Sequence, residues 1–227
     1  MKVAKQSVEL IDSCGDDLSV VNAARVSFAK QSSWANVGEY EHDNGYLELA
    51  EKDVKLINYL AKHKHKSPFN HCFMSFRVKA PIFVARQLVK HEYLPWNEVS
   101  RRYVTEEPEF YFPECWRKKA DNVKQGSSEE AVELNETWVA QVQKYSLGLY
   151  QDMLDVGVCP EQARMVLPQN TMTEWIWSGT LFAFAKMCKL RLDPHTQKET
   201  QEIAKMIDGE AKTLYPVSWE ALMEYGE

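Results

Sequence analysis

The sequence predicts a single α+β domain over residues 1–227, and two observations lead to this class. Segments with helical spacing of apolar residues are interleaved with a few strand-like segments, without the regular strand–helix alternation of a parallel α/β sheet. A chain of 227 residues with 44% hydrophobic residues also holds enough apolar side chains for one substantial core. We therefore expect helices and a few strands to share that core.

The strands are predicted by alternation and by composition. In 72–80, CFMSFRVKA, the side chains of Met74, Phe76, Val78 and Ala80 fall on one side and polar side chains on the other, as in a half-buried strand. Aromatic and β-branched residues favour strands elsewhere in the chain. These further strands are expected at 7–12, 109–113 and 171–179.

The helices are predicted by apolar residues three and four positions apart. We expect Asp17 to cap the first helix, Pro81 to occupy the first turn of a central one, and Pro95 to stop that helix, which leaves 93–103 as a structured loop. Residues 31–50 are predicted to form a surface loop and residues 118–128 a polar connector. The helices are expected at 17–28, 53–65, 81–92, 127–157, 160–168, 180–192 and 194–215.

The composition restricts the partners and the compartment. The net charge of −6 argues against a general nucleic-acid binder, which usually carries a basic excess. The five cysteines are scattered without a CxxC pair, so they predict neither a disulfide framework nor a zinc site. The first residues lack an apolar leader core, and no run of about 18 apolar residues follows. We expect a cytoplasmic protein that binds neither nucleic acid nor membrane.

Residues 84–103, VARQLVKHEYLPWNEVSRRY, concentrate hydrogen-bonding groups beside an apolar segment. On a helix, Arg86 and Lys90 would share one face because they are four positions apart. A guanidinium fork, a hydroxyl and an amide together suit a phosphate monoester, and the following loop would add Ser100 and Arg102. The alternative is a solvated helix face followed by a charged turn.

Three other groups of side chains are candidates for chemistry. Arg164 lies among apolar residues on a short helix, where it needs either an anionic ligand or a structural ion pair. The basic residues around Arg191 either bind an anion or complement a helix dipole. His63, His65 and His71 match metal-ligand spacing only loosely and lack a nearby carboxylate, so no metal is predicted. The glycine motifs of dinucleotide and P-loop folds are absent.

Several motifs together resemble one enzyme family. Seven residues separate the stretch KHE at 90–92 from Ser100, which matches the spacing of the Arg-His-Arg signature of the flavin-dependent thymidylate synthases, the ThyX family. The NExSxR pattern of that family is present at 97–102. Further blocks follow the family's order and cover most of the chain: NAARVSF, HKSPFNH, KAPIFVARQ, EQARMVLP and LRLDPHTQ.

This resemblance implies a ThyX-like single domain, with a small, mostly antiparallel sheet and surrounding helices, in a homotetramer whose active sites lie between subunits. It implies a methyltransferase that moves a one-carbon unit from methylenetetrahydrofolate to C5 of dUMP, with reduction by NADPH via FAD, to give dTMP. No cysteine nucleophile is needed, because reduced flavin carries the redox step while the protein positions and polarises the pyrimidine.

The resemblance also assigns residues. Arg191 is the catalytic candidate, because a guanidinium at the pyrimidine edge would favour the N3-ionised ring and raise electron density at C5. The residues expected to bind the nucleotide are Gln87, Lys90, Glu98, Val99, Ser100, Arg101, Arg102, Arg164 and Arg191. The residues expected to bind FAD are Ser67, Asn70, Lys90, His91, Glu92, Glu98, Thr180, Phe182 and Lys186.

Five positions on the FAD side depart from the family's pattern. Arg-His-Arg has become Lys-His-Glu, and Asn70, Phe182 and Lys186 stand where an acidic residue, a basic residue and an asparagine are common. Lysine lacks the planar fork of arginine, and Glu92 reverses a charge. One alternative is therefore a pyrimidine C5 hydroxymethylase or methylase that acts on dUMP or dCMP with altered flavin use, since an arginine can also donate to the N3 acceptor of cytosine. A catalytically silent nucleotide-binding homologue is the second alternative, although such a binder has less need of Arg191.

Overall fold

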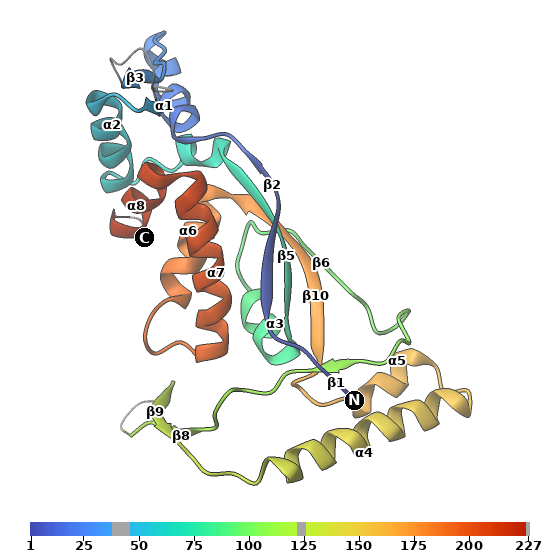
Figure 1. The fold of residues 1–227 in the computed structure, drawn as a ribbon. Coiled ribbons are helices and arrows are strands. Elements are labelled where there is room, and N and C mark those ends of the chain that lie inside the picture. Colours follow the sequence, from blue (N-terminus) through green and yellow to red (C-terminus); the bar gives the residue numbers. More distant parts are fainter. Residues whose placement is uncertain (38–45, 122–125, 226–227) are drawn as a thin grey trace.

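Four antiparallel strands form the central sheet of the protein (Figure 1). The structure is a computed structural model that describes residues 1–37, 46–121 and 126–225. In order across the sheet, the strands are β2 (Ser7–Cys14), β5 (Phe73–Pro81), β10 (Met172–Thr180) and β6 (Trp96–Glu98). The predicted α+β class and its mostly antiparallel sheet are confirmed.

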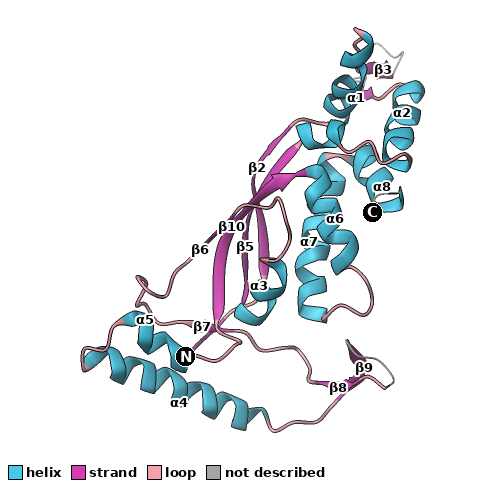
Figure 2. Cartoon of the chain, turned by 180° about the vertical axis from the view of Figure 1, so that it is seen from behind, coloured by secondary structure: helices cyan, strands magenta, loops and turns pink. Residues whose placement is uncertain are grey.

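Helices bury one face of this sheet. Met74, Phe76 and Val78 of β5 are completely buried, as their alternation predicted. Phe184 meets the rings of Phe76 and Trp177 edge to face, with centroid distances of 5.1 and 5.4 Å. This core therefore joins two strands to the helix that carries Arg191. The helices on this face are α3 (Ile82–Leu88), α6 (Leu181–Arg191) and α7 (Lys198–Leu214) (Figure 2).

A layer of helices covers one end of the sheet. Asp16, rather than the predicted Asp17, caps the first of them, since its carboxylate accepts from the backbone N–H of Ser19 at 2.7 Å. Asp17 is buried, and its carboxylate accepts the backbone N–H groups of Val217 and Ser218 at 3.0 and 2.8 Å. A tertiary contact thus decides between two adjacent aspartates. The layer consists of α1 (Asp17–Arg25), α2 (Glu51–Lys62) and α8 (Pro216–Tyr225), with the 3₁₀ helices η1 (Val26–Phe28) and η2 (Ser67–His71).

Two segments predicted as irregular contain short strand pairs. The predicted surface loop at 31–50 contains β3 (Ala35–Val37) paired with β4 (Tyr46–Glu48), and residues 38–45 between them lie outside the described residues. The predicted connector at 118–128 overlaps the pair of β8 (Arg117–Lys119) and β9 (Ser127–Ala131). The sequence did not predict these two strand pairs, because short surface strands carry polar side chains on their exposed faces and therefore resemble loops.

A long helix, α4 (Glu136–Asp155), extends away from the sheet, with α5 (Pro160–Ala163) and η3 (Arg164–Val166) beside it (Figure 1). The prediction that this helix begins at residue 127 is wrong, because β9 occupies its first residues and Asn135 caps the helix by accepting from the N–H of Thr137 at 3.1 Å. The strand predicted at 109–113 is β7 (Glu109–Phe110), which pairs in parallel with β1 (Lys2–Val3).

The helix predicted at 81–92 ends at Leu88, so Lys90 lies in the turn that follows. The predicted end of this helix at residue 92 is therefore wrong, although Arg86 and Lys90 line the same pocket. The loop predicted at 93–103 contains β6, because the ring of Trp96 stacks on Trp175 of β10 with a centroid distance of 4.1 Å. Residues 96–98 therefore pair with β10, although Pro95 directly before them predicted an irregular loop. None of the helices in the described residues is long and apolar enough to cross a membrane.

Candidate active site

Arg191, the last residue of α6, lines a pocket of 500 Å³. Its guanidinium donates from Nε to Nε2 of His91 and from Nη2 to the backbone carbonyl of Gln87, both at 2.9 Å. Gln87 in turn donates from Nε2 to Oε1 of Gln197 at 2.6 Å. These bonds join the end of α3, the turn after it and the segment after α6 into one polar wall. The other lining residues are Arg86, Lys90, Gly126, His195 and Thr196.

The imidazole of His91 is neutral in this arrangement, because its Nε2 atom accepts the hydrogen bond. Burial and the positive charges of Arg191 and Lys186 lower the pKa of His91 to about 4. Burial also lowers the pKa of Arg191 from its ordinary value, although a guanidinium stays protonated in proteins. A guanidinium has five N–H donors, and the bonds to His91 and Gln87 use two. No other hydrogen bond of this guanidinium is formed within the described residues, so its remaining donors can bind a ligand.

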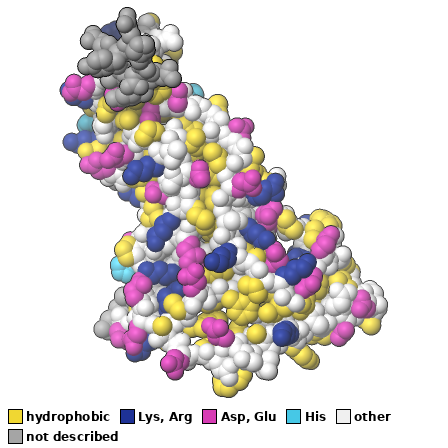
Figure 3. Space-filling model, viewed as in Figure 1, with side chains coloured by type: hydrophobic (Ala, Val, Ile, Leu, Met, Phe, Trp, Pro, Cys, Tyr) yellow, Lys and Arg dark blue, Asp and Glu magenta, His cyan; other side chains and the backbone are white. Residues whose placement is uncertain are grey.

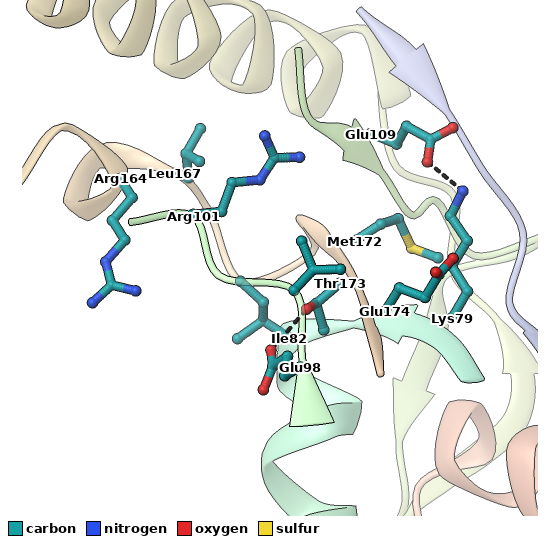
Figure 4. A pocket seen from close by; sticks show the side chains of 11 residues that line it. Lys79, Ile82, Glu98, Arg101, Glu109, Arg164, Leu167, Met172, Thr173 and Glu174 are labelled. Carbon is teal, nitrogen blue, oxygen red and sulfur yellow. Dashed lines mark hydrogen bonds and ion pairs between the residues drawn. The ribbon is translucent and has the colours of Figure 1, made fainter. Parts of the chain in front are cut away.

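A second pocket, of 270 Å³, lies between β6, β10 and η3. Glu98, Val99, Arg101 and Arg164 line it, and the carboxylate of Glu98 accepts from Oγ1 of Thr173 at 2.7 Å. In Figure 4, the side chains of Arg101 and Arg164 extend away from each other. The two side chains line the same pocket but do not converge in it.

Ser100 and Arg102 form a pair just after β6. Arg102 donates from Nε to Oγ of Ser100 at 3.1 Å, and its guanidinium lies 5.0 Å from the ring centroid of Tyr103. Arg164 donates from Nε to the carbonyl of Glu161 at 3.3 Å and is exposed. Among the described residues Arg164 makes no ion pair, so the structural role considered for it lacks a partner there.

The residues expected to bind FAD fall into separate groups. Ser67 and Asn70 lie on η2, and Thr180, Phe182 and Lys186 lie at the beginning of α6. Lys90, His91 and Glu92 follow α3, and Glu98 ends β6. Thr180 caps α6 and donates from Oγ1 to Oδ1 of Asn70 at 2.8 Å. The ammonium group of Lys66 lies 5.3 Å from the ring centroid of Phe182. Lys186 follows Phe182 by one helical turn. The exposed members of the set are Ser67, Asn70, Glu92, Lys90, Glu98 and Lys186.

Gln197, which the sequence grouped with Arg191 in the block LRLDPHTQ, fixes the amide of Gln87. One residue of these clusters, Lys66, was missed in the sequence. Lys66 lies directly before Ser67, but it belongs to a basic run that is easily taken for a solvated surface. The described residues contain no group of three or more His, Cys, Asp or Glu side chains arranged to hold a metal ion.

Known proteins match this chain over most of its length. Residues 9–217 match the model of the Thy1 family, described as thymidylate synthase complementing protein. The chain belongs to the Thy1 family. A flavin-dependent thymidylate synthase from Thermus thermophilus is 39% identical over 226 residues, which cover 97% of this chain and 77% of that protein. A protein of the same description from Pseudothermotoga lettingae is 34% identical over 218 residues, covering 96% and 90%.

Solved structures of a UMP/dUMP methylase share the fold of this Thy1-family chain. The UMP/dUMP methylase PolB from Streptomyces cacaoi, bound with 5-Br dUMP, superposes with a TM-score of 0.82 at 30% sequence identity and covers 100% of this chain and 98% of that chain. PolB bound with 5-Br UMP gives a TM-score of 0.82 at 28% identity, with 99% and 97% covered. The family match and the relatives described as flavin-dependent thymidylate synthases confirm the resemblance seen in the sequence.

Proposed function

We propose that this chain is a flavin-dependent thymidylate synthase, a methyltransferase that converts dUMP to dTMP. Methylenetetrahydrofolate would supply the one-carbon unit, NADPH the reducing equivalents and FAD the redox cofactor. The observation that carries the proposal is the fixed guanidinium of Arg191 in a polar pocket with Gln87 and Lys90. The relatives named flavin-dependent thymidylate synthase support the activity, and PolB, a UMP/dUMP methylase, supports the nucleotide class.

Arg191 would activate the pyrimidine by charge. C5 of uracil is a poor nucleophile, and it becomes more reactive when the ring carries the negative charge of an ionised N3. A guanidinium beside N3 stabilises that charge. The bonds to His91 and to the carbonyl of Gln87 hold the guanidinium in one orientation, so little reorganisation is needed when the ring becomes anionic.

The buried thiols are poor candidates for a competing nucleophile. Burial, together with the nearby carboxylates of Asp16 and Asp17, raises the pKa of Cys72 to about 12. Burial also raises the pKa of Cys188 well above its ordinary value. Because the thiolate is the reactive form of cysteine, neither group is reactive at neutral pH.

The phosphate would be held by the second group of residues, which includes Ser100, Arg102 and Arg164. Arg164 and Arg191 line different pockets of one chain. We propose that a nucleotide that contacts both groups receives them from different subunits. This arrangement supports active sites that lie where subunits meet.

An exposed apolar face of α4 supports association of the chains. Trp138, Val142, Tyr145 and Leu149 follow the spacing of one helix face, and Trp138 and Tyr145 are 64% and 77% exposed. Figure 3 shows apolar side chains over the lower part of the molecule, where Figure 1 places α4. Exposed apolar patches of this kind mark interaction surfaces. We propose that they are covered in a homotetramer.

The residues on the FAD side fit a cofactor that carries a diphosphate. Lys66, Lys90 and Lys186 would supply ammonium groups for the phosphates, the ring of Phe182 an apolar surface, and Asn70 polar contacts. An ammonium group binds phosphate as a point charge, without the two-pronged contact of arginine. Bound reduced flavin would supply the two electrons that turn the transferred methylene into a methyl group. We expect FAD to bind, but less tightly than at a site with two arginines.

The proposal is tested by loading the purified chain with FAD and recording its visible absorption spectrum with and without dUMP. Methylenetetrahydrofolate and NADPH are then added and the nucleotide product is identified by chromatography. A flavin spectrum that shifts with dUMP, followed by dTMP, is the expected result. Binding of dUMP without any product would overturn the activity and leave a nucleotide-binding homologue.

A second candidate is favoured by one observation on the FAD side. Glu92, two positions after Lys90, has an exposed carboxylate, whereas the family has arginines at both positions. A hydroxymethylase acting on dUMP or dCMP needs methylene transfer and water but no net reduction, so weakened flavin contacts would harm it less. The same incubation separates the two candidates: 5-hydroxymethyl product formed without consumption of NADPH would support the hydroxymethylase.

A further inference from the structure

Residues 62–66, Lys-His-Lys-His-Lys, form a basic segment directly after α2. All five side chains are exposed. Lys64, His65 and Lys66 line a small hollow whose other wall includes Phe182. The proposed chemistry uses only Lys66 of this segment.

The shape of the basic segment is defined by local contacts. The backbone N–H groups of Lys64 and His65 bond to carbonyls in the last turn of α2 at 3.1 and 2.8 Å. Lys64 has a φ of 60°, in the left-handed region that side-chain-bearing residues seldom adopt. The rings of His63 and His65 lie 4.3 and 6.0 Å from the ring of Tyr59. A positive group at a helix C-terminus complements the helix dipole, but that role needs neither five basic residues in a row nor their contact with the FAD side.

We propose that the basic segment binds the γ-linked glutamate tail of the folate co-substrate, an inference that rests on the proposed function. The reacting carbon of the folate must reach the pyrimidine beside the FAD-side residues, and the tail at the far end of the molecule must leave toward solvent. Lys66 contacts Phe182 and precedes Ser67, so the basic segment forms the rim of that region. Each added glutamate brings one carboxylate, and a row of ammonium and imidazole groups complements such a chain.

Each contact of this kind is weak by itself because the groups are exposed. Several of them add up when the folate is already anchored by its ring system, since tethering raises the local concentration of carboxylates. We expect a folate with five glutamates to bind about tenfold more tightly than one with a single glutamate at low ionic strength. The advantage should shrink as salt screens the charges.

The test is calorimetric binding of tetrahydrofolate, with one or five γ-linked glutamates, to the full FAD-loaded chain. The double variant Lys62→Gln, Lys64→Asn removes two charges, and asparagine tolerates the left-handed backbone at position 64. The matched control, Lys52→Gln with Lys55→Gln, removes the same charge from the opposite end of α2. The pentaglutamate advantage is expected to fall to about twofold or less in the first variant and to persist in the control.

The outcomes separate this inference from the proposed function. Equal affinity of the two folates, or equal loss in both double variants, would overturn the tail site even if dTMP is formed. The 2′-phosphate of NADPH presents similar chemistry, so NADPH and NADH are compared in parallel. A preference for NADPH that depends on Lys62 and Lys64, without a pentaglutamate advantage, would assign the segment to that phosphate and overturn the inference. Absence of dTMP from the monoglutamate would instead contradict the proposed function.

Discussion

The Nε atom of Arg191 donates a hydrogen bond to Nε2 of His91 across 2.9 Å. The bond requires an imidazole without a proton on Nε2, because a protonated ring would meet the guanidinium as a second cation. A neutral histidine thus orients the charged group that is expected to polarise the pyrimidine. The same contact makes the site sensitive to acid.

The first prediction concerns pH. The pKa of His91 falls from 6.5 to about 4 on folding, so between these values the unfolded chain binds more protons at this position than the folded chain. His91 therefore does not reduce the free energy of unfolding above pH 6.5. As pH falls from 6.5 toward 4, the unfolded chain takes up the proton first, and the free energy of unfolding decreases. His91→Gln keeps an acceptor but does not titrate, so its stability should depend less on pH there. Urea unfolding at fixed protein concentration measures this, and parallel profiles for the two proteins would refute the prediction.

The second prediction concerns Arg191. Arg191→Ala should fold but lose about 3 to 4 kcal/mol of transition-state stabilisation, which lowers turnover by two to three orders of magnitude. Arg191→Lys should be intermediate, because it keeps the charge but not the planar fork. Turnover at saturating dUMP is measured alongside Lys212→Ala, which removes an exposed cation of α7. Near-normal turnover of Arg191→Ala would remove this residue from the mechanism.

The third prediction concerns the phosphate. Arg102→Ala and Arg164→Ala should each weaken dUMP binding by about 10- to 100-fold, because a hydrogen bond to a charged group contributes about 1.5 to 3 kcal/mol. Deoxyuridine, which lacks the phosphate, should bind the variants and the unaltered chain equally. Calorimetry with both ligands measures the effect. Unchanged dUMP affinity in both variants would exclude these arginines from phosphate binding.

The fourth prediction concerns assembly. Trp138→Ser combined with Tyr145→Ser should dissociate the proposed tetramer, since both side chains belong to the exposed apolar face of α4. Lys144→Ser, an exposed position on another face of the same helix, should leave assembly intact. Light scattering of all three proteins gives the masses. A monomeric unaltered chain would contradict the tetramer and leave the active site incomplete.

The fifth prediction concerns Gly179, where β10 approaches the turn after His91. A Cβ atom at this position would lie 2.2 Å from Cδ2 of the buried Leu94 and 3.2 Å from the carbonyl of Tyr93. Gly179→Ala should therefore destabilise the fold by about 1 to 3 kcal/mol. Gly209→Ala is the control, because a Cβ there meets open space on helix α7 and should stabilise by about 0.5 to 1 kcal/mol. Equal unfolding midpoints for the two variants would contradict the close packing at Gly179.

Local patterns predicted most of the core elements. The alternation in 72–80 identified β5 and its buried face, and apolar spacing identified α6 and α7. The failures lie where a distant partner outweighs a local signal. Pro95 marked a turn, yet Trp96 packs on Trp175 and draws the chain into the sheet. Asp17 had the character of an N-cap, yet it binds the beginning of α8 because α8 packs against α1.

The sequence alone determined the fold class, the family resemblance and the residue types available for chemistry, because periodicity, spacing and charge are written along the chain. The tertiary structure decided which of those residues meet. Arg191 contacts His91 across 100 positions of the sequence, and Gln87 contacts Gln197 across 110. The tertiary structure also places Arg164 and Arg191 in different pockets. Such contacts depend on the pairing of strands and the packing of helices from the whole chain, and no local propensity specifies them.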